Sequence, residues 1–335
     1  MKRTGTIIII SLILACGFLA GTSLAGEKVY RLRLQSYYPP PTIHGDKNFA
    51  KNVEEMSNGR IKISVFAGGE LVPTPDILKA VKSGTVDMAH AVSVFFSEYE
   101  LAGIDAGLPL AWNNAHEAEI LYNMGMRELV TAEYAKHGVH FLSEYWAAPF
   151  HIISTTPVSS IADLKKIKVT TAGEAAMMMM NLGVGVVDMP PEDIYLGLTT
   201  GVVDGVIYGG ALEYQLMKLH EAAKYYNTTP IFDPATDALL INPKKWESLP
   251  KDLQAILLSA ARQARWDYYN WVLSKEYELR ETIFKGHLTS FSDADMAVLN
   301  EAAQKVWDKS AERGPAAAKG IEMVKKFNRW MGRLE

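Results

Sequence analysis

The sequence has little of what metal, disulfide and catalytic sites require. Its 335 residues include one cysteine, Cys16, so the chain can form neither an internal disulfide nor a thiolate metal site. The HExxH, GxSxG, CxxC and P-loop patterns are all absent. The eight histidines are scattered, and His137 and His140 flank a glycine turn. We therefore expect no catalytic residues, no metal and no cofactor.

An excess of positive charge is also missing. The chain carries 34 Lys and Arg against 38 Asp and Glu, a formal net charge of −4, whereas a nucleic-acid-binding protein needs a basic face. No block of like charges suggests an interaction tail. The composition, 48% hydrophobic and 21% charged, is that of a globular protein long enough for two packed domains. We expect a monomer with no nucleic-acid partner.

Long apolar runs are confined to the N-terminus. Two basic residues precede an apolar segment over 6–19, which is too short to cross a bilayer comfortably. Residues 23–25 (Ser-Leu-Ala) offer the small side chains that a signal peptidase reads. We predict a signal peptide over 1–25 and an exported, periplasmic product. Lipidation of Cys16 is the alternative.

The remaining chain alternates strand and helix patterns, which predicts an α/β fold. Strands are expected over 29–34, 61–66, 86–94, 139–146, 184–187, 202–207 and 238–241. Helices are expected over 46–57, 74–84, 116–124, 127–136, 174–182, 253–284 and within 293–335.

Two strand segments are interpreted as crossings between domains. The strand over 139–146 continues to residue 153 after Ala147-Ala148-Pro149, and the strand over 238–241 returns the chain to the first domain. Domain I is therefore predicted to comprise residues 26–147 and about 237–275. Domain II is predicted to comprise residues 148–236 and the C-terminal helices.

The central stretch over 184–210 reads VGVVDMPPEDIYLGLTTGVVDGVIYGG. Its first strand is expected to be buried and to end at the two prolines, which lack the N–H that a ladder needs. Glu192 and Asp193 then open a short helix, with Tyr195 a candidate for its apolar side, and Gly201 closes it. A second strand follows, so the stretch predicts a βαβ unit. Such units bind ligands at the carboxyl ends of their strands.

The segment MPPEDIYLGLTTGVVDG resembles the signature of the solute-binding proteins of TRAP transporters. Further stretches resemble the family in the same order: NFAKNVEEMSNGRIKISVFAGGEL (48–71), AVKSGTVDMAHA (80–91), PVSSIADLKKIKV (157–169) and INPKKWESLPKDLQAIL (241–257). Together they cover nearly the whole mature chain. The resemblance implies a two-domain clamshell of the periplasmic-binding-protein type (type II-like). It also implies a ligand cleft between the domains, closure by hinge bending and a long helix spanning both.

The resemblance implies a function as well. The protein is expected to capture a small organic solute, an organic acid or a related molecule, and to deliver it to the membrane permease subunits of a TRAP transporter. A sensory receptor for a membrane kinase is the alternative. An exported enzyme on the same frame is a weaker alternative, because no nucleophile with an adjacent base is visible in the sequence.

The sequence departs from the family where ligand carboxylates are bound. The family usually places an arginine at the end of D-L-K-G-L-K-I-R, where this chain has Thr170. A second arginine near the crossing strand is replaced by Pro149 or Phe150, and Tyr208 follows the Asp-Gly pair. None of these side chains can replace a guanidinium fork. We predict that hydroxyls and backbone amides hold the ligand's polar group, while Tyr or Trp faces stack on its body.

The candidate ligand-binding residues lie at strand exits and crossings. They are Tyr37, Tyr38, Ser93, Phe95, Trp146, Phe150, Thr170, Glu174 and Tyr208. At least two of the aromatic residues are expected to belong to the core instead. Glu174 could face a ligand amine or cap the methionine-rich helix over 174–182.

Overall fold

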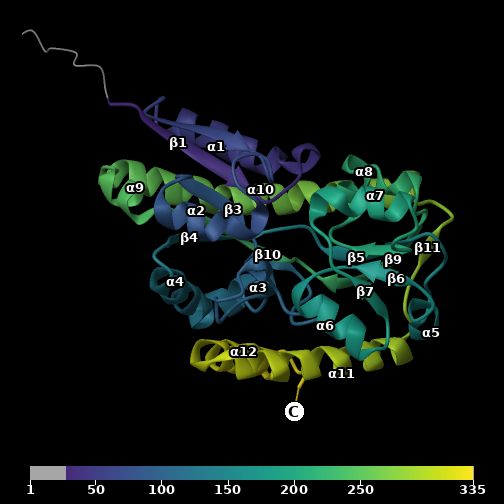
Figure 1. Cartoon of the computed structure of the whole chain (residues 1–335). Coiled ribbons are helices and arrows are strands. Elements are labelled where there is room, and N and C mark those ends of the chain that lie inside the picture. Colours follow the sequence, from purple (N-terminus) through teal and green to yellow (C-terminus); the bar gives the residue numbers. More distant parts are fainter. Residues whose placement is uncertain (1–27, 335) are drawn as a thin grey trace, which may run out of the picture.

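The computed structural model describes residues 28–334, and these form two β-sheets with helices packed around them (Figure 1). The predicted signal peptide and Cys16 lie outside the described residues. Between residues 28 and 334, none of the helices is both long and apolar enough to cross a membrane. The fold is mixed α/β, as predicted.

The first sheet has the strand order β2-β1-β3-β10-β4. Its strands are β1 (Tyr30–Ser36), β2 (Ile61–Phe66), β3 (Met88–Ala91), β4 (His140–Trp146) and β10 (Thr236–Ile241). β1 pairs in parallel with β2 and β3, whereas β10 runs antiparallel to β3 and β4. The carboxyl ends of β1 and β3 therefore meet at one edge of the sheet.

The second sheet has the strand order β11-β9-β5-β8-β6-β7. Its strands are β5 (Phe150–Ser154), β6 (Lys168–Thr170), β7 (Gly185–Val187), β8 (Gly205–Ile207), β9 (Tyr225–Phe232) and β11 (Leu288–Thr289). β6 pairs in parallel with both β7 and β8, so the two strands of the predicted βαβ unit flank β6. β7 is less buried than predicted, because it is the edge strand of this sheet.

Twelve α-helices cover the sheets within the described residues. They are α1 (His44–Met56), α2 (Ile77–Ser83), α3 (Ala115–Leu121), α4 (Arg127–Lys136), α5 (Ile161–Leu164), α6 (Gly173–Asn181), α7 (Ile194–Thr199), α8 (Ala211–Leu216), α9 (Pro243–Ser248), α10 (Lys251–Thr282), α11 (Asp293–Ser310) and α12 (Pro315–Trp330). Short helical turns are η1 (Pro40–Thr42), η2 (Thr74–Asp76), η3 (Ser93–Phe95), η4 (Tyr122–Met126), η5 (Pro191–Asp193), η6 (Leu219–Glu221) and η7 (Ala311–Arg313).

Most of the predicted elements are present, with shorter bounds in several places. The strand predicted over 61–66 and the helix predicted over 127–136 coincide with β2 and α4. The strand predicted over 202–207 begins only at Gly205, and Tyr195 is 41% exposed, so it does not belong to the buried side of α7. β9 and α8 were not predicted.

The chain passes between the sheets at residues 147–149, at residues 233–235 and along α10. α10 packs on α1 and β4 of the first sheet and on α8 near the second, and Figure 1 shows it running behind both halves. α11 packs against α6, and α12 packs against α11 as well as α3, η4 and α4. The prediction places all C-terminal helices in the second domain, whereas α12 also contacts α4, a helix that packs on β4 of the first sheet.

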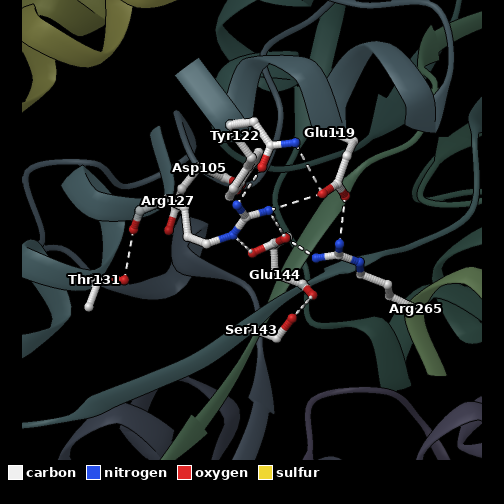
Figure 2. Close-up of polar contacts among 9 residues, drawn as sticks. Asp105, Glu119, Tyr122, Arg127, Thr131, Ser143, Glu144 and Arg265 are labelled. Carbon is white, nitrogen blue, oxygen red and sulfur yellow. Dashed lines mark hydrogen bonds and ion pairs between the residues drawn. The ribbon is translucent and has the colours of Figure 1, made fainter. Parts of the chain in front are cut away.

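A partly buried ionic network ties α10 to the first sheet just before the first crossing (Figure 2). The Arg127 Nη2 atom lies 2.6 Å from Glu144 Oε1 and 3.2 Å from Glu119 Oε1. Arg265 of α10 binds the same two carboxylates, with 2.6 Å between its Nη2 and Glu119 Oε2. Two cations thus neutralise two anions, which is the condition under which buried charges are tolerated.

Candidate ligand-binding site

A cavity of about 80 Å³ lies between the two sheets. Its walls come from the carboxyl ends of strands on both sides. Tyr37 follows β1 and Val92 follows β3, while Thr170 ends β6 and Tyr208 follows β8. This is the place where open α/β sheets bind ligands, because several strand ends and loops converge there.

Six of the nine predicted site residues line this cavity. They are Tyr37, Phe95, Phe150, Thr170, Glu174 and Tyr208. The structure brings them together from segments that are up to 171 positions apart, counting from Tyr37 to Tyr208. Tyr38, Ser93 and Trp146 do not line it.

Trp146 lies in the hydrophobic core, with no exposed side-chain surface. Its ring centroid is 5.5 Å from that of Tyr122 in an edge-on contact, and the Arg265 guanidinium carbon lies 5.2 Å from the ring centre. These neighbours cover the face that a ligand would need. We therefore withdraw the prediction that Trp146 stacks on a ligand.

The hydroxyls of Ser93 and Tyr38 bond to other protein groups next to the cavity. The Ser93 hydroxyl donates to Asp105 Oδ1 and accepts a bond of 3.0 Å from the Gly103 amide, which holds the loop after β3 in place. The Tyr38 hydroxyl donates to Asp237 Oδ2 over 2.9 Å. Neither hydroxyl is therefore directed at the cavity.

Asp237, at the start of β10, is the main polar residue that the sequence analysis missed. It lines the cavity, and its Oδ1 accepts a bond of 3.0 Å from the Tyr37 hydroxyl. Its Oδ2 lies 3.1 Å from His90 Nε2, and His90 Nδ1 lies 2.7 Å from Asp46 Oδ1. The only signal in the sequence is a lone acid ahead of the apolar run at 238–241. Buried acids need partners, and these partners are distant in sequence.

The imidazole of His90 is held between the two carboxylates. Burial alone would lower its pKa, but the charge of Asp46 and the hydrogen bonds to Asp237 and Asp46 outweigh burial and raise the pKa to about 10. His90 is therefore a cation at neutral pH. Burial, followed by the charge of Asp237, raises the pKa of Tyr37 and Tyr38, so both hydroxyls stay protonated and donate.

The hydroxyl of Tyr208 is buried and has no hydrogen-bond partner among the described residues. Its backbone is fixed, because the Tyr208 amide donates to the Tyr214 hydroxyl over 3.2 Å and that hydroxyl donates to the His151 carbonyl over 2.6 Å. Burial, and then the charge of Asp237, raises the pKa of Tyr208. A neutral, fixed phenol without a partner is a group that a ligand can satisfy.

Glu174 lines the cavity, but its carboxylate has partners. The Arg313 guanidinium binds its Oε1, and the Ser310 hydroxyl donates to the same oxygen over 3.1 Å. The predicted capping role is not observed, because Ala172 is the N-cap of α6 and no side chain caps this helix end. Glu174 instead links α6 to the turn between α11 and α12.

Apart from Thr171, the rest of the lining is apolar, and Phe232 and Met189 are among its residues that were not predicted. The Phe150 ring lies edge-on to Phe232 with 5.5 Å between centroids and is tilted against Tyr208 at 6.1 Å. Among the described residues that line the cavity, none is Lys, Arg or His. No group of three or more His, Cys, Asp or Glu within residues 28–334 is placed to hold a metal ion.

Comparison with known proteins identifies the family. Residues 40–314 match the model of bacterial extracellular solute-binding protein family 7. The chain is 28% identical over 312 residues to the monocarboxylate 2-oxoacid-binding periplasmic protein of Nostoc sp., covering 91% of this chain and 86% of that protein.

Solved structures give the same result. A TRAP periplasmic solute-binding protein from Chromohalobacter salexigens, with bound (S)-(+)-2-amino-1-propanol, superposes with a TM-score of 0.86 at 28% identity and covers 91% of this chain and 97% of that one. A TRAP protein from Pseudoalteromonas atlantica, solved with sodium and pyruvate, gives a TM-score of 0.80 at 23% identity and covers 91% and 95%. The second likeness shows the fold alone. The family match, together with the cavity between the two sheets, makes this chain a TRAP solute-binding protein of bacterial extracellular solute-binding protein family 7.

Proposed function

We propose that this receptor is exported to the periplasm, encloses a solute of few heavy atoms in the cavity between its sheets, and presents it as a monomer to the membrane permease subunits of a TRAP transporter. The observation that carries the proposal is the cavity itself. It is built from strand ends of both sheets and holds about 80 Å³, which suits a small molecule.

Closure would involve the three crossing segments. Two of them, residues 147–149 and 233–235, are short links between strands of different sheets, and α10 is the third. A few residues at the ends of such elements can absorb the rotation of one lobe against the other. We assign domain I to the first sheet and domain II to the second, with boundaries at these links and with α12 on the side of domain I.

The relatives support a small solute but differ in its chemistry. The Nostoc protein is named for 2-oxoacids, and the Chromohalobacter protein holds an amino alcohol. We propose Tyr37, Phe95, Phe150, Thr170, Tyr208 and Asp237 as ligand contacts, without an arginine clamp and without a resident cofactor. A catalytic role is not proposed, because the family that the chain matches is one of solute-binding proteins.

A thermal-shift screen tests the proposal. Organic acids, amines, amino alcohols and polyols would be added to the mature protein. A ligand at a hundredfold its Kd should raise the free energy of unfolding by about 2.7 kcal/mol.

Small-angle scattering with a confirmed ligand should then show a smaller radius of gyration than the free protein. A radius that does not change on binding would contradict the clamshell. Neighbouring reading frames encoding a membrane kinase instead of permease subunits would favour the sensory alternative.

A further inference from the structure

The charges around the cavity discriminate between classes of solute. Of the described residues that line it, Asp237 and Glu174 are the only ionisable carboxylates, and no basic side chain is among them. An anionic solute would have to leave water for a site that offers it no cation. The cost of burying a charge is large unless an opposite charge or several hydrogen bonds compensate it.

The two carboxylates are not equivalent. Glu174 is paired with the Arg313 guanidinium, so the pair is neutral. Asp237 shares one imidazolium, that of His90, with the carboxylate of Asp46. Two anions around one cation leave a net charge of −1 on this cluster, in which the exposed fraction of each of the three side chains is 2% or less. The negative charge therefore acts on the cavity with little screening by water.

The hydrogen-bonding groups point to the same class of solute. Asp237 Oδ1 accepts one bond in the structure, from the Tyr37 hydroxyl, and a carboxylate oxygen has room for a second donor. The buried Tyr208 hydroxyl has no partner among the described residues, and as a phenol it can accept as well as donate. An ammonium group is a set of donors with no acceptor, so it would use both oxygens. The phenyl walls of Phe95 and Phe150 would cover a short apolar body.

We propose that the cavity selects a small amine, with the ammonium group bound between the Asp237 carboxylate and the Tyr208 hydroxyl, and that it rejects small carboxylates. This inference rests on the proposed function and specifies its solute. The expected charge preference is the reverse of that of an arginine-clamped receptor, because Asp237 lines the cavity and no arginine is among the described residues that line it.

Three compounds with one skeleton test the charge preference by calorimetry on the mature protein. They are 1-amino-2-propanol, 1,2-propanediol and lactate, which share a three-carbon chain and a hydroxyl on the central carbon. The amine should bind most tightly. The diol should bind roughly 10- to 100-fold more weakly, because its terminal hydroxyl can still donate to Asp237 but carries no charge and has only one donor. Lactate should bind more weakly still.

Two variants locate the ammonium contact. Asp237→Asn removes the charge and should abolish the preference of the amine over the diol. Tyr208→Phe keeps the ring and removes only the hydroxyl, so it should weaken amine binding roughly 3- to 10-fold even if Asp237→Asn does not fold. Glu301→Gln is the control, because it removes an exposed acid that does not line the cavity, and it should preserve the preference.

The outcomes separate this inference from the proposed function. Lactate binding as tightly as the amine, or more tightly, would overturn the inference while leaving a receptor in place. An unchanged amine preference in Asp237→Asn, or an unchanged amine affinity in Tyr208→Phe, would overturn the assigned contact. If no compound of any charge stabilised the protein in the wider screen, the proposed function itself would fail.

Discussion

The stability of this protein should fall as the pH rises above neutrality, because of the imidazole of His90. In the folded state the pKa of His90 is raised from 6.5 to about 10, against the effect of burial, chiefly by the neighbouring Asp46 carboxylate. Between these two pH values the folded chain binds a proton that the unfolded chain does not. The stabilisation is therefore fully present below pH 6.5 and is lost as the pH rises towards about 10.

The size of the effect follows from the shift. One pKa unit corresponds to about 1.36 kcal/mol, so a shift from 6.5 to about 10 corresponds to about 5 kcal/mol in total. Between pH 6.5 and about 9, roughly 3 kcal/mol of that stabilisation should disappear. Asp46→Asn keeps the imidazole and its contact with Asp237 but removes the charge that raises the pKa most. This variant should lose much less stability over the same interval.

Urea unfolding at a series of pH values, followed by tryptophan fluorescence, measures these differences. Asp163→Asn is a suitable control. The pKa of this half-buried acid is lowered, first by its hydrogen bond with Lys166, so it titrates on the acid side and should leave the alkaline slope unchanged. If Asp46→Asn showed the same slope of free energy against pH as the wild-type protein, the His90 account would be refuted.

Three further predictions concern the core, the site and the N-terminus. Glu144→Gln should cost about 3 kcal/mol of stability in urea unfolding, because the buried Arg265 and the partly exposed Arg127 then share one anion, Glu119. Glu301→Gln in an exposed i,i+4 pair should show no measurable loss. Trp146→Ala should destabilise the fold by about 3–5 kcal/mol but leave ligand affinity within error in calorimetry, and a large loss of affinity in a folded variant would return this residue to the site. Mass spectrometry of the exported protein should find a chain beginning near Gly26, and a diacylated Cys16 would contradict this.

Local signals were sufficient for many of the elements. Apolar and polar residues alternate over 61–65, and this segment forms β2. A glycine ends α2, because Gly84 adopts a left-handed conformation (φ 82°) that other residues rarely accept. The parallel direction of β7 and β8 was predicted from a short helix, α7, between two β-branched runs, and both strands pair in parallel with β6. In each case the deciding interactions lie within about one element, so the residues concerned are close together in the sequence.

The pattern of apolar residues does not predict the neighbours of a strand that is covered on both faces, or the burial of a strand at the edge of a sheet. β4 is buried on both faces and packs against α4 and α10. The position of Trp146 at the end of this strand therefore did not reveal which neighbours its ring contacts. β7 was expected to be buried, but it lies at the edge of its sheet, and a strand's place in the sheet depends on pairings with distant segments.

The sequence by itself determined the α/β class, the two crossings between the sheets, the missing arginine at Thr170 and six of the residues that line the cavity, because these depend on local patterns and on a family signature. Only the tertiary structure decided that Asp237 faces that cavity beside Tyr37, which is 200 positions away, that His90 and Asp46 complete its cluster, and that Trp146 turns into the core. Charges and rings acquire their roles from neighbours that the chain brings together only on folding. The net charge at the site therefore could not be read from the residues one at a time.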